Sequence, residues 1–522
     1  MRMFKVSYFC SFLLVIMIMT QGFILSQPYE ITASDFEFNL GSTSIHKIIG
    51  HDKDNYFVLK HFGNQYHLEK LDRNLNFLLE EPVKLYEKLK TYDLESVVHF
   101  HGELYIFVSR RKFSETVLYY QKIDKESLRP LTGFIELTTI NFIRGNWPDF
   151  HFVLSRRETK LLIACRIKLN WEKVQHNELF VYDKGMELVW ERKDYFEFSG
   201  QGPRENEYLV DEQGNISILS LIKRESILSL FQDIKNSYII YRYTNAGKTF
   251  REYPIALENR YIRGVKILGG ENGELICSGL YSELFRTGVG GTFFFMIDPE
   301  NGTIYYNQLH PFSKEFLARL MDVEEPIMAD EEVLRYTLTD LILRKNGNVI
   351  LIAEQLFEQS YNTYNNLIIS CFDTTGRVNW SQVVQKRQDY DIRYLMQYNV
   401  DITDYRSLVR DTGSLNQFFE NYCSYALIAP LERNDITIIY NDHFRNLEQG
   451  GKQKNFNNPR KSYLAAAHID EFGNLTEYNL LRWKRKSLYP EPLRYYDTLG
   501  ETVIIPAFRG RKFNYYKITT EY

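Results

Sequence analysis

The sequence is poor in cysteine and nearly balanced in charge, and it has no long apolar run beyond its N-terminal segment. Five of the 522 residues are cysteine and no Cys-x-x-Cys pair occurs, which argues against a zinc site. The net charge of -4 gives no bulk attraction to nucleic acid or to an anionic membrane surface. Because a spanning helix needs about 20 apolar residues, we expect no transmembrane span in the mature chain.

The sequence also lacks the motifs of the common enzyme classes. No Gly-x-Ser-x-Gly elbow is present, so a propeller joined to a hydrolase domain is not expected. The glycine-rich run Gly288–Gly291 precedes a strand-like segment and opens no helix, which argues against a phosphate cradle. No catalytic constellation stands out.

The N-terminal segment has the form of a secretory signal peptide. Arg2 and Lys5 give a basic start, Phe9–Met19 is apolar, and Thr20–Gln27 is more polar. We predict a signal peptide over residues 1–26, a single domain over 27–522, and export to the periplasm or the cell surface. The alternative, an uncleaved anchor, is disfavoured because the apolar run is short of a full span.

The cysteines after the signal segment are far apart, and each lies in an apolar, strand-like run. Disulfides would be an option in an exported protein. We instead expect buried free thiols that pack as small hydrophobic side chains. The residues concerned are Cys165, Cys277, Cys371 and Cys423.

A β-hairpin pattern recurs along the chain. Leu367–Phe372 is apolar and rich in β-branched and aromatic residues, and Val378–Val384 follows it after a turn at Asp373–Gly376. Asp can hydrogen-bond the backbone just ahead of it, and Gly can take the positive φ of a tight reversal. Just upstream, Asn346-Gly347 lies between two apolar runs, which is a strong hairpin signal. The region therefore predicts four antiparallel strands.

Eight such four-strand sets can be placed along the chain, and six of them carry an aspartate in the turn between the third and fourth strands. Short strands at even spacing predict an all-β fold, and a repeated four-stranded meander favours a β-propeller. We predict eight blades, with seven as the alternative. The last set lacks one strand, and we expect the N-terminal strand-like segment Ser34–Leu40 to close that blade. The turn aspartates are Asp72, Asp124, Asp183, Asp298, Asp373 and Asp470.

Three insertions interrupt the repeats, near residues 310–335, 386–422 and 444–461. The first begins with Ser313–Met321, which predicts a short helix with Ser313 as its N-cap. The third is basic. No low-complexity linker divides the chain, so the insertions are expected to project from one domain.

Two segments resemble the PQQ-type repeat of bacterial eight-bladed propellers. They are Phe372–Trp380 (FDTTGRVNW) and Tyr182–Trp190 (YDKGMELVW), and Gly200–Glu205 (GQGPRE) resembles a loop of secreted NHL-like propellers. The PQQ-repeat family includes periplasmic scaffold lipoproteins and quinoprotein dehydrogenases. The resemblance implies a propeller in which each Trp packs between blades. The other sets have Tyr, Phe or Leu in place of Trp, so no functional residue is carried over.

A few residues are candidates for a site. His99 and His101 lie two apart on a predicted strand, which would place them on one side with a spacing that can bind a metal; the alternative is two polar residues near the turn at Gly102. Exposed aromatic residues in loops can stack on glycans, and the basic insertion can bind a partner; the alternative for each Trp is that it covers a blade edge. These binding candidates are Trp147, Trp171, Lys452, Lys454 and Arg460.

We therefore expect an exported, non-enzymatic β-propeller that acts as a monomeric scaffold in the cell envelope and needs no cofactor. Its partner would be an envelope protein or a glycan, bound on the rim that the insertions shape. The alternative is a propeller enzyme that acts on glycans or uses a quinone or a metal in the central channel, with carboxylates converging from different blades.

Overall fold

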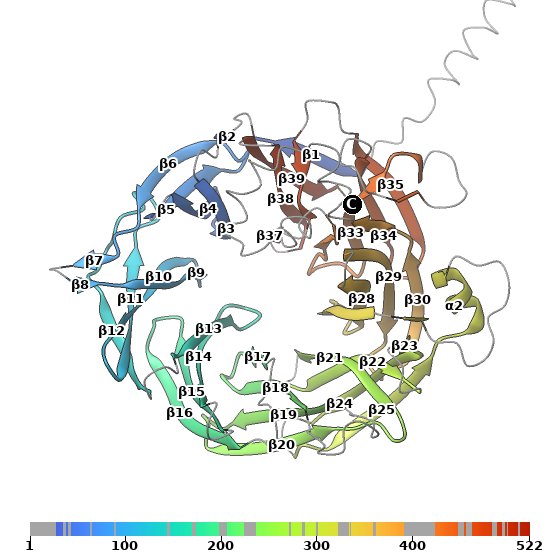
Figure 1. Ribbon diagram of the computed structural model, residues 1–522, viewed down its shortest axis with the longest axis horizontal. Helices are drawn as coiled ribbons and strands as arrows, with labels where there is room; N and C mark the ends of the chain where they lie inside the picture. The colour runs from blue at the N-terminus through green and yellow to red at the C-terminus, as the bar shows by residue number, and fades with distance from the viewer. Residues whose placement is uncertain are drawn as a thin grey trace, which may run out of the picture.

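The chain forms an eight-bladed β-propeller whose blades are antiparallel sheets arranged around a central axis (Figure 1). In each blade the first strand lies nearest the axis and the fourth lies at the outside (Figure 1). The predicted fold class and blade number are confirmed. The structure is a computed structural model that describes residues 28–34, 38–39, 43–62, 65–87, 90–142, 147–169, 174–197, 206–223, 236–270, 273–283, 288–298, 301–321, 333–334, 336–358, 362–390, 423–446, 454–455, 462–482, 488–492, 496–497, 500–509 and 512–521.

The first four blades are regular four-stranded meanders. Blade 1 contains β3 (Thr43–His51), β4 (Asn55–Phe62), β5 (Gln65–Asp72) and β6 (Phe77–Pro82); blade 2 contains β9 (Asp93–Phe100), β10 (Glu103–Arg111), β11 (Glu115–Ile123) and β12 (Ile135–Asn141); blade 3 contains β13 (Asp149–Leu154), β14 (Lys160–Leu169), β15 (Val174–Asp183) and β16 (Leu188–Glu197); blade 4 contains β17 (Asn206–Val210), β18 (Ile216–Lys223), β19 (Asn236–Thr244) and β20 (Thr249–Ile255). A small hairpin, β7 (Tyr86–Glu87) and β8 (Lys90–Thr91), joins blades 1 and 2.

The next three blades repeat the pattern around added segments. Blade 5 contains β21 (Tyr261–Gly269), β22 (Leu275–Ser282), β24 (Gly291–Ile297) and β25 (Ile304–Pro311); blade 6 contains β27 (Tyr336–Leu343), β28 (Val349–Glu358), β29 (Asn362–Phe372) and β30 (Val378–Val384); blade 7 contains β32 (Ala426–Ile428), β33 (Ile436–His443), β34 (Ser462–Ile469) and β35 (Leu475–Arg482). The added segments include β23 (Gly288–Val289), which pairs with β26 (Val333–Leu334), the helix α2 (Lys314–Met321), and β31 (Gln388–Tyr390), which pairs with β29.

The predicted helix is confirmed, together with its cap. Ser313 Oγ accepts a hydrogen bond of 3.2 Å from Phe316 N, which satisfies one of the free N–H groups at the helix start. Phe316, Leu317 and Leu320 are buried against blades 5 and 6. The helix is thus fixed to the outside of the ring by its apolar face.

Blade 8 joins the two ends of the chain. Its inner part is β36 (Tyr489–Pro490) and β37 (Tyr496–Asp497), followed by β38 (Thr502–Arg509) and β39 (Lys512–Thr520), and its outer strand is β1 (Tyr29–Ala33). The expected closure by an N-terminal strand is confirmed, but its predicted position, Ser34–Leu40, is wrong by several residues. The main pairing runs from Tyr29 opposite Thr520 to Ala33 opposite Tyr516, and of the predicted segment β2 (Phe38–Asn39) pairs with β39.

The shift has a physical reason in the pattern of burial. Tyr29 is buried against blade 7, where its ring packs edge-on to Tyr478 at 5.4 Å and its hydroxyl lies 3.3 Å from Thr437 Oγ1. Ile31 packs in the same apolar cluster. Tyr29 and Ile31, two residues apart on the strand, therefore provide the apolar face with which blade 8 packs against blade 7.

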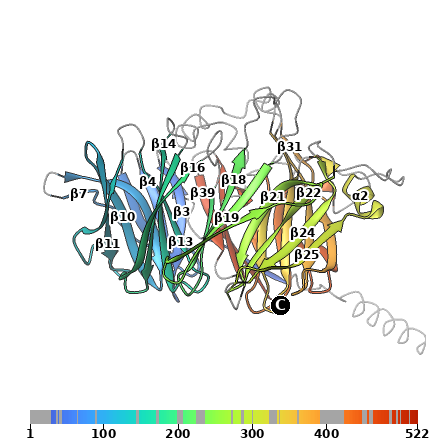
Figure 2. The ribbon, with the colours of Figure 1, turned by 90° about the horizontal axis from the view of Figure 1, so that it is seen from below.

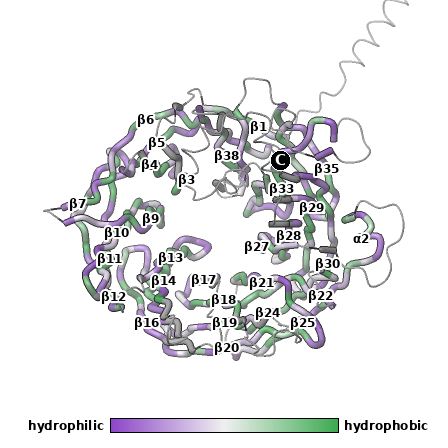
Figure 3. The backbone as a smooth tube through the Cα atoms, viewed as in Figure 1, coloured by the Kyte–Doolittle hydropathy of each residue, from purple (hydrophilic) through white to green (hydrophobic). Residues whose placement is uncertain are grey.

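The apolar core lies between the blades rather than at the axis. Eight buried clusters are found in the described residues, one at each interface between neighbouring blades, and hydrophobic segments occur all around the ring (Figure 3). Each blade buries both faces only when it has a neighbour on each side. Cys165, Cys277, Cys371 and Cys423 are buried free thiols, as predicted.

The aspartate turns have the expected geometry. Asp373 Oδ1 accepts hydrogen bonds from Thr375 N at 2.8 Å and from Arg377 N at 3.0 Å, and Gly376 has φ 78°. Burial alone would raise the pKa of Asp373, but these hydrogen bonds, with one from the Thr375 hydroxyl, outweigh it and lower that pKa. All six predicted turn aspartates accept a backbone N–H two to four residues ahead.

Removing one turn carboxylate should have a modest effect. Asp373→Ala is expected to lower the free energy of unfolding by about 1–2 kcal/mol, because the N–H groups of Thr375 and Arg377 lose their acceptor. Asp373→Asn keeps an acceptor oxygen and should lose less. Urea denaturation of both variants tests this, and equal losses would show that charge rather than hydrogen bonding holds the turn.

Candidate binding face

The strand order gives the ring two different faces. Asp72, Asp183 and Asp373 mark one of them, which we call the turn face, because it carries the turns between the third and fourth strands of the blades. The opposite face, the loop face, carries the hairpins between the second and third strands and the connections between blades. Figure 2 shows the ring edge-on, with the strands crossing from one face to the other.

All three insertions start and end at the loop face. The first follows β25 in the connection between blades 5 and 6, the second follows β30 in the connection between blades 6 and 7, and the third lies between β33 and β34 of blade 7. Each of these junctions is at the same end of the strands. The predicted rim is therefore one continuous side of the molecule over blades 5 to 7.

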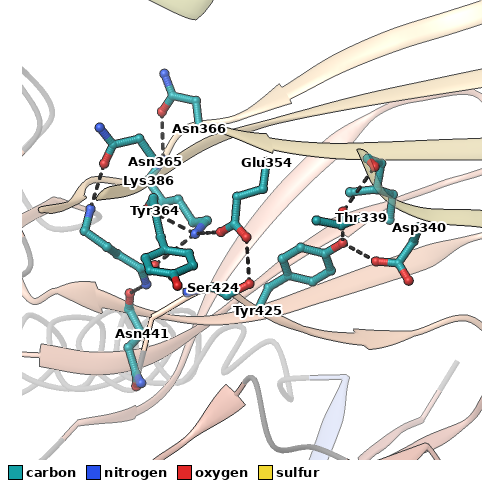
Figure 4. A network of polar contacts seen from close by, with 12 residues as sticks. Thr339, Asp340, Glu354, Tyr364, Asn365, Asn366, Lys386, Ser424, Tyr425 and Asn441 are labelled. Atoms are coloured by element: carbon teal, nitrogen blue, oxygen red, sulfur yellow. Dashed lines mark hydrogen bonds and ion pairs between the residues drawn. The ribbon is translucent and has the colours of Figure 1, made fainter. Parts of the chain in front are cut away.

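A buried ion pair secures the second insertion where it leaves blade 6 (Figure 4). The Lys386 ammonium and the Glu354 carboxylate pair directly, and their side chains are 0% and 1% exposed. Lys386 Nζ also donates to Gln388 Oε1 at 2.9 Å and to the Tyr364 carbonyl at 3.2 Å. These contacts saturate the three N–H donors of the ammonium.

The same network reaches the point where the insertion returns. Ser424 Oγ donates to Glu354 Oε2 at 2.7 Å, and Ser424 N donates to Gln388 Oε1 at 2.9 Å. Gln388 Nε2 donates to the Asn441 carbonyl at 2.7 Å. Residues on both sides of the insertion are thus joined through Glu354 and Gln388, which fixes the base of the insertion on blades 6 and 7.

Tyr425 extends the network toward the axis. Its hydroxyl donates to the Asp340 carboxylate and lies 2.6 Å from Thr339 Oγ1. Complete burial raises the pKa of Tyr425 well above its usual value. The phenol therefore stays protonated, as the hydrogen bond to Asp340 requires.

A second anchor holds the third insertion. Asn446 Nδ2 donates to Asp442 Oδ1 at 2.7 Å and to the Lys454 carbonyl at 3.0 Å, and Lys454 N donates to Asn446 Oδ1 at 2.7 Å. Asp442 Oδ1 also accepts from His443 N at 2.7 Å. Burial raises the pKa of Asp442 to about 7, although the hydrogen bonds oppose that rise. Asp442 thus links this insertion to the core of blade 7.

An aromatic patch lies on the loop face at blade 2, away from the insertions. Phe113, in the hairpin between β10 and β11, is 76% exposed, and Trp147, just before β13, is 47% exposed. The ring of Trp147 packs on Phe142 at 5.1 Å, and the Arg111 guanidinium lies 5.1 Å from its centroid. We call these four residues, Phe113, Phe142, Trp147 and Arg111, the aromatic patch.

Charged residues border the aromatic patch on the side of the axis. Asp93 lies 3.4 Å from Arg111 Nε, and Asp149 lies 2.5 Å from Arg166 Nη2. Glu95 lies behind them, where burial raises its pKa and a 2.5 Å hydrogen bond from Ser109 opposes that rise. The patch therefore combines exposed aromatic rings, a cation and carboxylates.

The two candidate metal ligands do not lie on one side of a strand. β9 ends at Phe100, so His99 is on the strand, while His101 lies in the turn with φ 49° and is exposed. His99 stacks on Phe57 with centroids 6.1 Å apart, and burial lowers its pKa to about 4. Within the described part of the chain no group of three or more His, Cys, Asp or Glu side chains is placed to hold a metal ion.

Of the five binding candidates, two lie in the part of the chain that the structure describes and three lie outside it. Trp147 is on the loop face, half exposed, and Lys454 is exposed beside Asn446. Trp171, Lys452 and Arg460 lie outside the described residues, as do the predicted signal peptide and Gly200–Glu205. Among the described residues, no helix has the length and apolar character to cross a bilayer.

The sequence did not point to Arg111, Glu354, Lys386 or Asp442. For Glu354 a signal was present, because it directly follows the apolar run Val349–Ala353, and a charge next to such a buried run requires a partner. Arg111 becomes informative only when the fold brings it beside Trp147.

Comparison with known proteins shows similar structures but no matching sequence family. No protein-family model and no curated protein matches the chain. The WD40 domain of SCAP from fission yeast matches with a TM-score of 0.43 and 8% identity, over 96% of this chain and 97% of that one. The PL25 ulvan lyase matches with a TM-score of 0.37 and 9% identity, over 81% and 91%. Prolyl oligopeptidase B from Galerina marginata matches with a TM-score of 0.39 and 8% identity, over 92% of this chain and 55% of that one, so this chain spans about half of its length. No residue or activity is transferred from these proteins.

Proposed function

We propose that the protein is an exported, non-catalytic binding propeller of the cell envelope, which holds another protein or a glycan on its loop face. The observation that carries the proposal is the aromatic patch, because its exposed side chains, Phe113 at 76% and Trp147 at 47%, are grouped with a cation, and grouped rather than scattered exposed apolar surface marks interaction sites. Export is supported by the basic and apolar N-terminal segment.

The composition of the patch suits both kinds of ligand. Trp, Phe and Arg are enriched at protein interfaces, and Trp and Arg are enriched among the residues that carry most of the binding energy. Aromatic faces beside carboxylates such as Asp93 also suit a sugar ring, whose apolar face stacks on the aromatic ring while its hydroxyls donate to the carboxylate. The anchored bases of the second and third insertions give the same face a rigid support.

The test compares exposed aromatic residues of the loop face with an exposed phenylalanine of the turn face. Immobilised protein is probed with envelope extract and with a glycan array, and the ligand found is titrated against Phe113→Ala and Trp147→Ala. We expect each substitution to weaken binding by about 30-fold or more, as for the central residues of an interface. The control is Phe472→Ala, in a turn-face loop of blade 7, where Phe472 is 74% exposed.

Two results would contradict the proposal. If Phe472→Ala reduced binding as much as Phe113→Ala, the loop face would not be the site. If the purified protein carried a stoichiometric metal or quinone, or cleaved a glycan that it bound, the alternative of a propeller enzyme would replace the non-catalytic one.

A further inference from the structure

Tryptophan fills the turn-face end of two blade interfaces. Trp190 of blade 3 donates from Nε1 to the Gly214 carbonyl of blade 4 at 2.9 Å, and a Cβ added to Gly247 would lie 2.7 Å from its ring. Trp380 of blade 6 donates to the Glu471 carbonyl of blade 7 at 3.1 Å, and Gly473 packs against its ring in the same way. Each ring thus fills a slot between its own blade and a turn of the next.

Blade 2 has no aromatic side chain at the equivalent position. Trp190 lies opposite Val181, and Trp380 lies opposite Cys371. Val181 and Cys371 each stand two residues before a turn aspartate. The corresponding residue of blade 2 is Lys122, two before Asp124, and its carbonyl accepts from Leu131 N at 2.8 Å. The tryptophan position is therefore taken by Leu131, which is 58% exposed, and at Gly133, two residues further on, an added Cβ would meet nothing within 4 Å. The slot between blades 2 and 3 thus lacks the ring that Trp190 and Trp380 provide in their interfaces.

A hollow of about 420 Å³ lies at this place, which we call the turn-face pocket. Its volume is within the range of small-molecule sites. Two tyrosine rings, Tyr105 and Tyr120, form one wall, with centroids 6.0 Å apart and a tilt of 58°. The lining residues are His101, Glu103, Tyr105, Tyr120, Lys122, Thr132, Ile135, Lys184, Gly185 and Met186.

The charges at the turn-face pocket favour an anion. Glu103 and Lys122 form an ion pair at 3.3 Å, so they largely compensate each other. Lys184, in the turn of blade 3, adds a further positive charge. The pocket thus offers an aromatic wall for a flat ring. Among its lining side chains the lysines exceed the carboxylates by one, and the Glu158 carboxylate, which accepts from His101 N at 3.3 Å, lies at the same edge.

We propose that the turn-face pocket binds a planar aromatic acid. The ring of the ligand takes the place that Trp190 and Trp380 take in their interfaces, between the tyrosine wall and the Lys184–Met186 turn. The acidic group lies toward Lys184 and Lys122. This site is on the opposite face from the proposed partner surface and does not depend on it.

The experiment titrates the full mature chain with three probes of similar ring and different charge. Indole-3-acetate, indole and tryptamine are compared by isothermal titration calorimetry at low ionic strength. We expect indole-3-acetate to bind at least about tenfold more tightly than tryptamine, with indole between them. No binding of indole-3-acetate at millimolar concentration, or equal binding of tryptamine, would overturn the proposal.

Matched variants locate the site. Ile135→Trp places a ring in the pocket and should abolish binding, whereas Leu188→Trp, at the equivalent first residue of β16, should not; Ile135 and Leu188 are 41% and 48% exposed. Lys184→Ala should weaken indole-3-acetate about threefold to tenfold and leave indole unchanged. Lys248→Ala, in the turn that packs on Trp190, is its control. If Lys184→Ala and Lys248→Ala act alike, the proposal fails even where Ile135→Trp does not fold.

Discussion

Replacing Lys386 with methionine is expected to lower the free energy of unfolding by about 3–5 kcal/mol. The substitution leaves the Glu354 carboxylate buried at 1% exposure without its ammonium partner. It also removes the donor to Gln388 Oε1 and to the Tyr364 carbonyl. The measurement is the midpoint of urea denaturation at pH 7, with fluorescence and circular dichroism followed together.

A double variant separates the charge from the space that the side chains fill. Lys386→Met with Glu354→Leu removes both charges and should recover much of the loss, because a buried pair often contributes little beyond an apolar pair of similar volume. The exposed pair Lys345 and Glu432, 2.8 Å apart, gives the control, and Lys345→Met should leave the midpoint nearly unchanged. A loss for Lys386→Met no larger than that of Lys345→Met would show that the network does not hold blades 6 and 7 together.

The same variant has a second expected effect on the loop face. Because Lys386 and Ser424 are joined through Glu354, loss of the ion pair should free the base of the second insertion. Limited proteolysis should then cut between residues 391 and 422 faster than in the unmodified protein. Cleavage at an unchanged rate would mean that Gln388 and the pairing of β31 with β29 are sufficient to hold the base.

The sequence allowed the blades to be predicted because local chemistry determines them. Asp373 and Gly376 specify their turn within four residues, and the continuous apolar run Val349–Ala353 specifies a strand that is buried on both faces. The resemblance at Trp190 and Trp380 correctly implied their place between blades. The closing strand was misplaced because Tyr29 and Ile31 gain their burial only from blade 7 and blade 8, which are distant in the sequence.

The candidate site was harder to predict, because it depends on residues that only the ring brings together. Arg111 and Trp147 lie on the second strand of blade 2 and before the first strand of blade 3. A continuous strand would place His99 and His101 on one side, but β9 ends at Phe100 and His101 lies in the following turn with φ 49°. The turn-face pocket lies where the interfaces after blades 3 and 6 hold a tryptophan ring, and that difference is visible only when the interfaces are compared.

The stability of the protein is expected to fall by about 3 kcal/mol between pH 5 and pH 8 through Asp442 alone. Burial raises the pKa of Asp442 from 3.8 to about 7 in the folded protein. Between these values the folded state binds a proton that the unfolded state has lost, so the slope of the unfolding free energy with pH is negative. The contribution is present below pH 4 to 5 and is lost as the pH rises through 7.

Asp442→Asn isolates this contribution from the other titrating groups. Asparagine keeps an oxygen that can accept from His443 N and Asn446 Nδ2 but has no proton to lose. His99, whose pKa burial lowers to about 4, acts in the opposite direction, since there the unfolded state binds the extra proton between pH 4 and 6.5. When the unfolding free energies of Asp442→Asn and the unmodified protein are subtracted, the contribution of His99 cancels and that of Asp442 remains. As the pH rises from 5 to 8, Asp442→Asn should therefore gain stability relative to the unmodified protein. Parallel stability curves over that range would show that Asp442 is ionised throughout and that the anchor of the third insertion is charged rather than neutral.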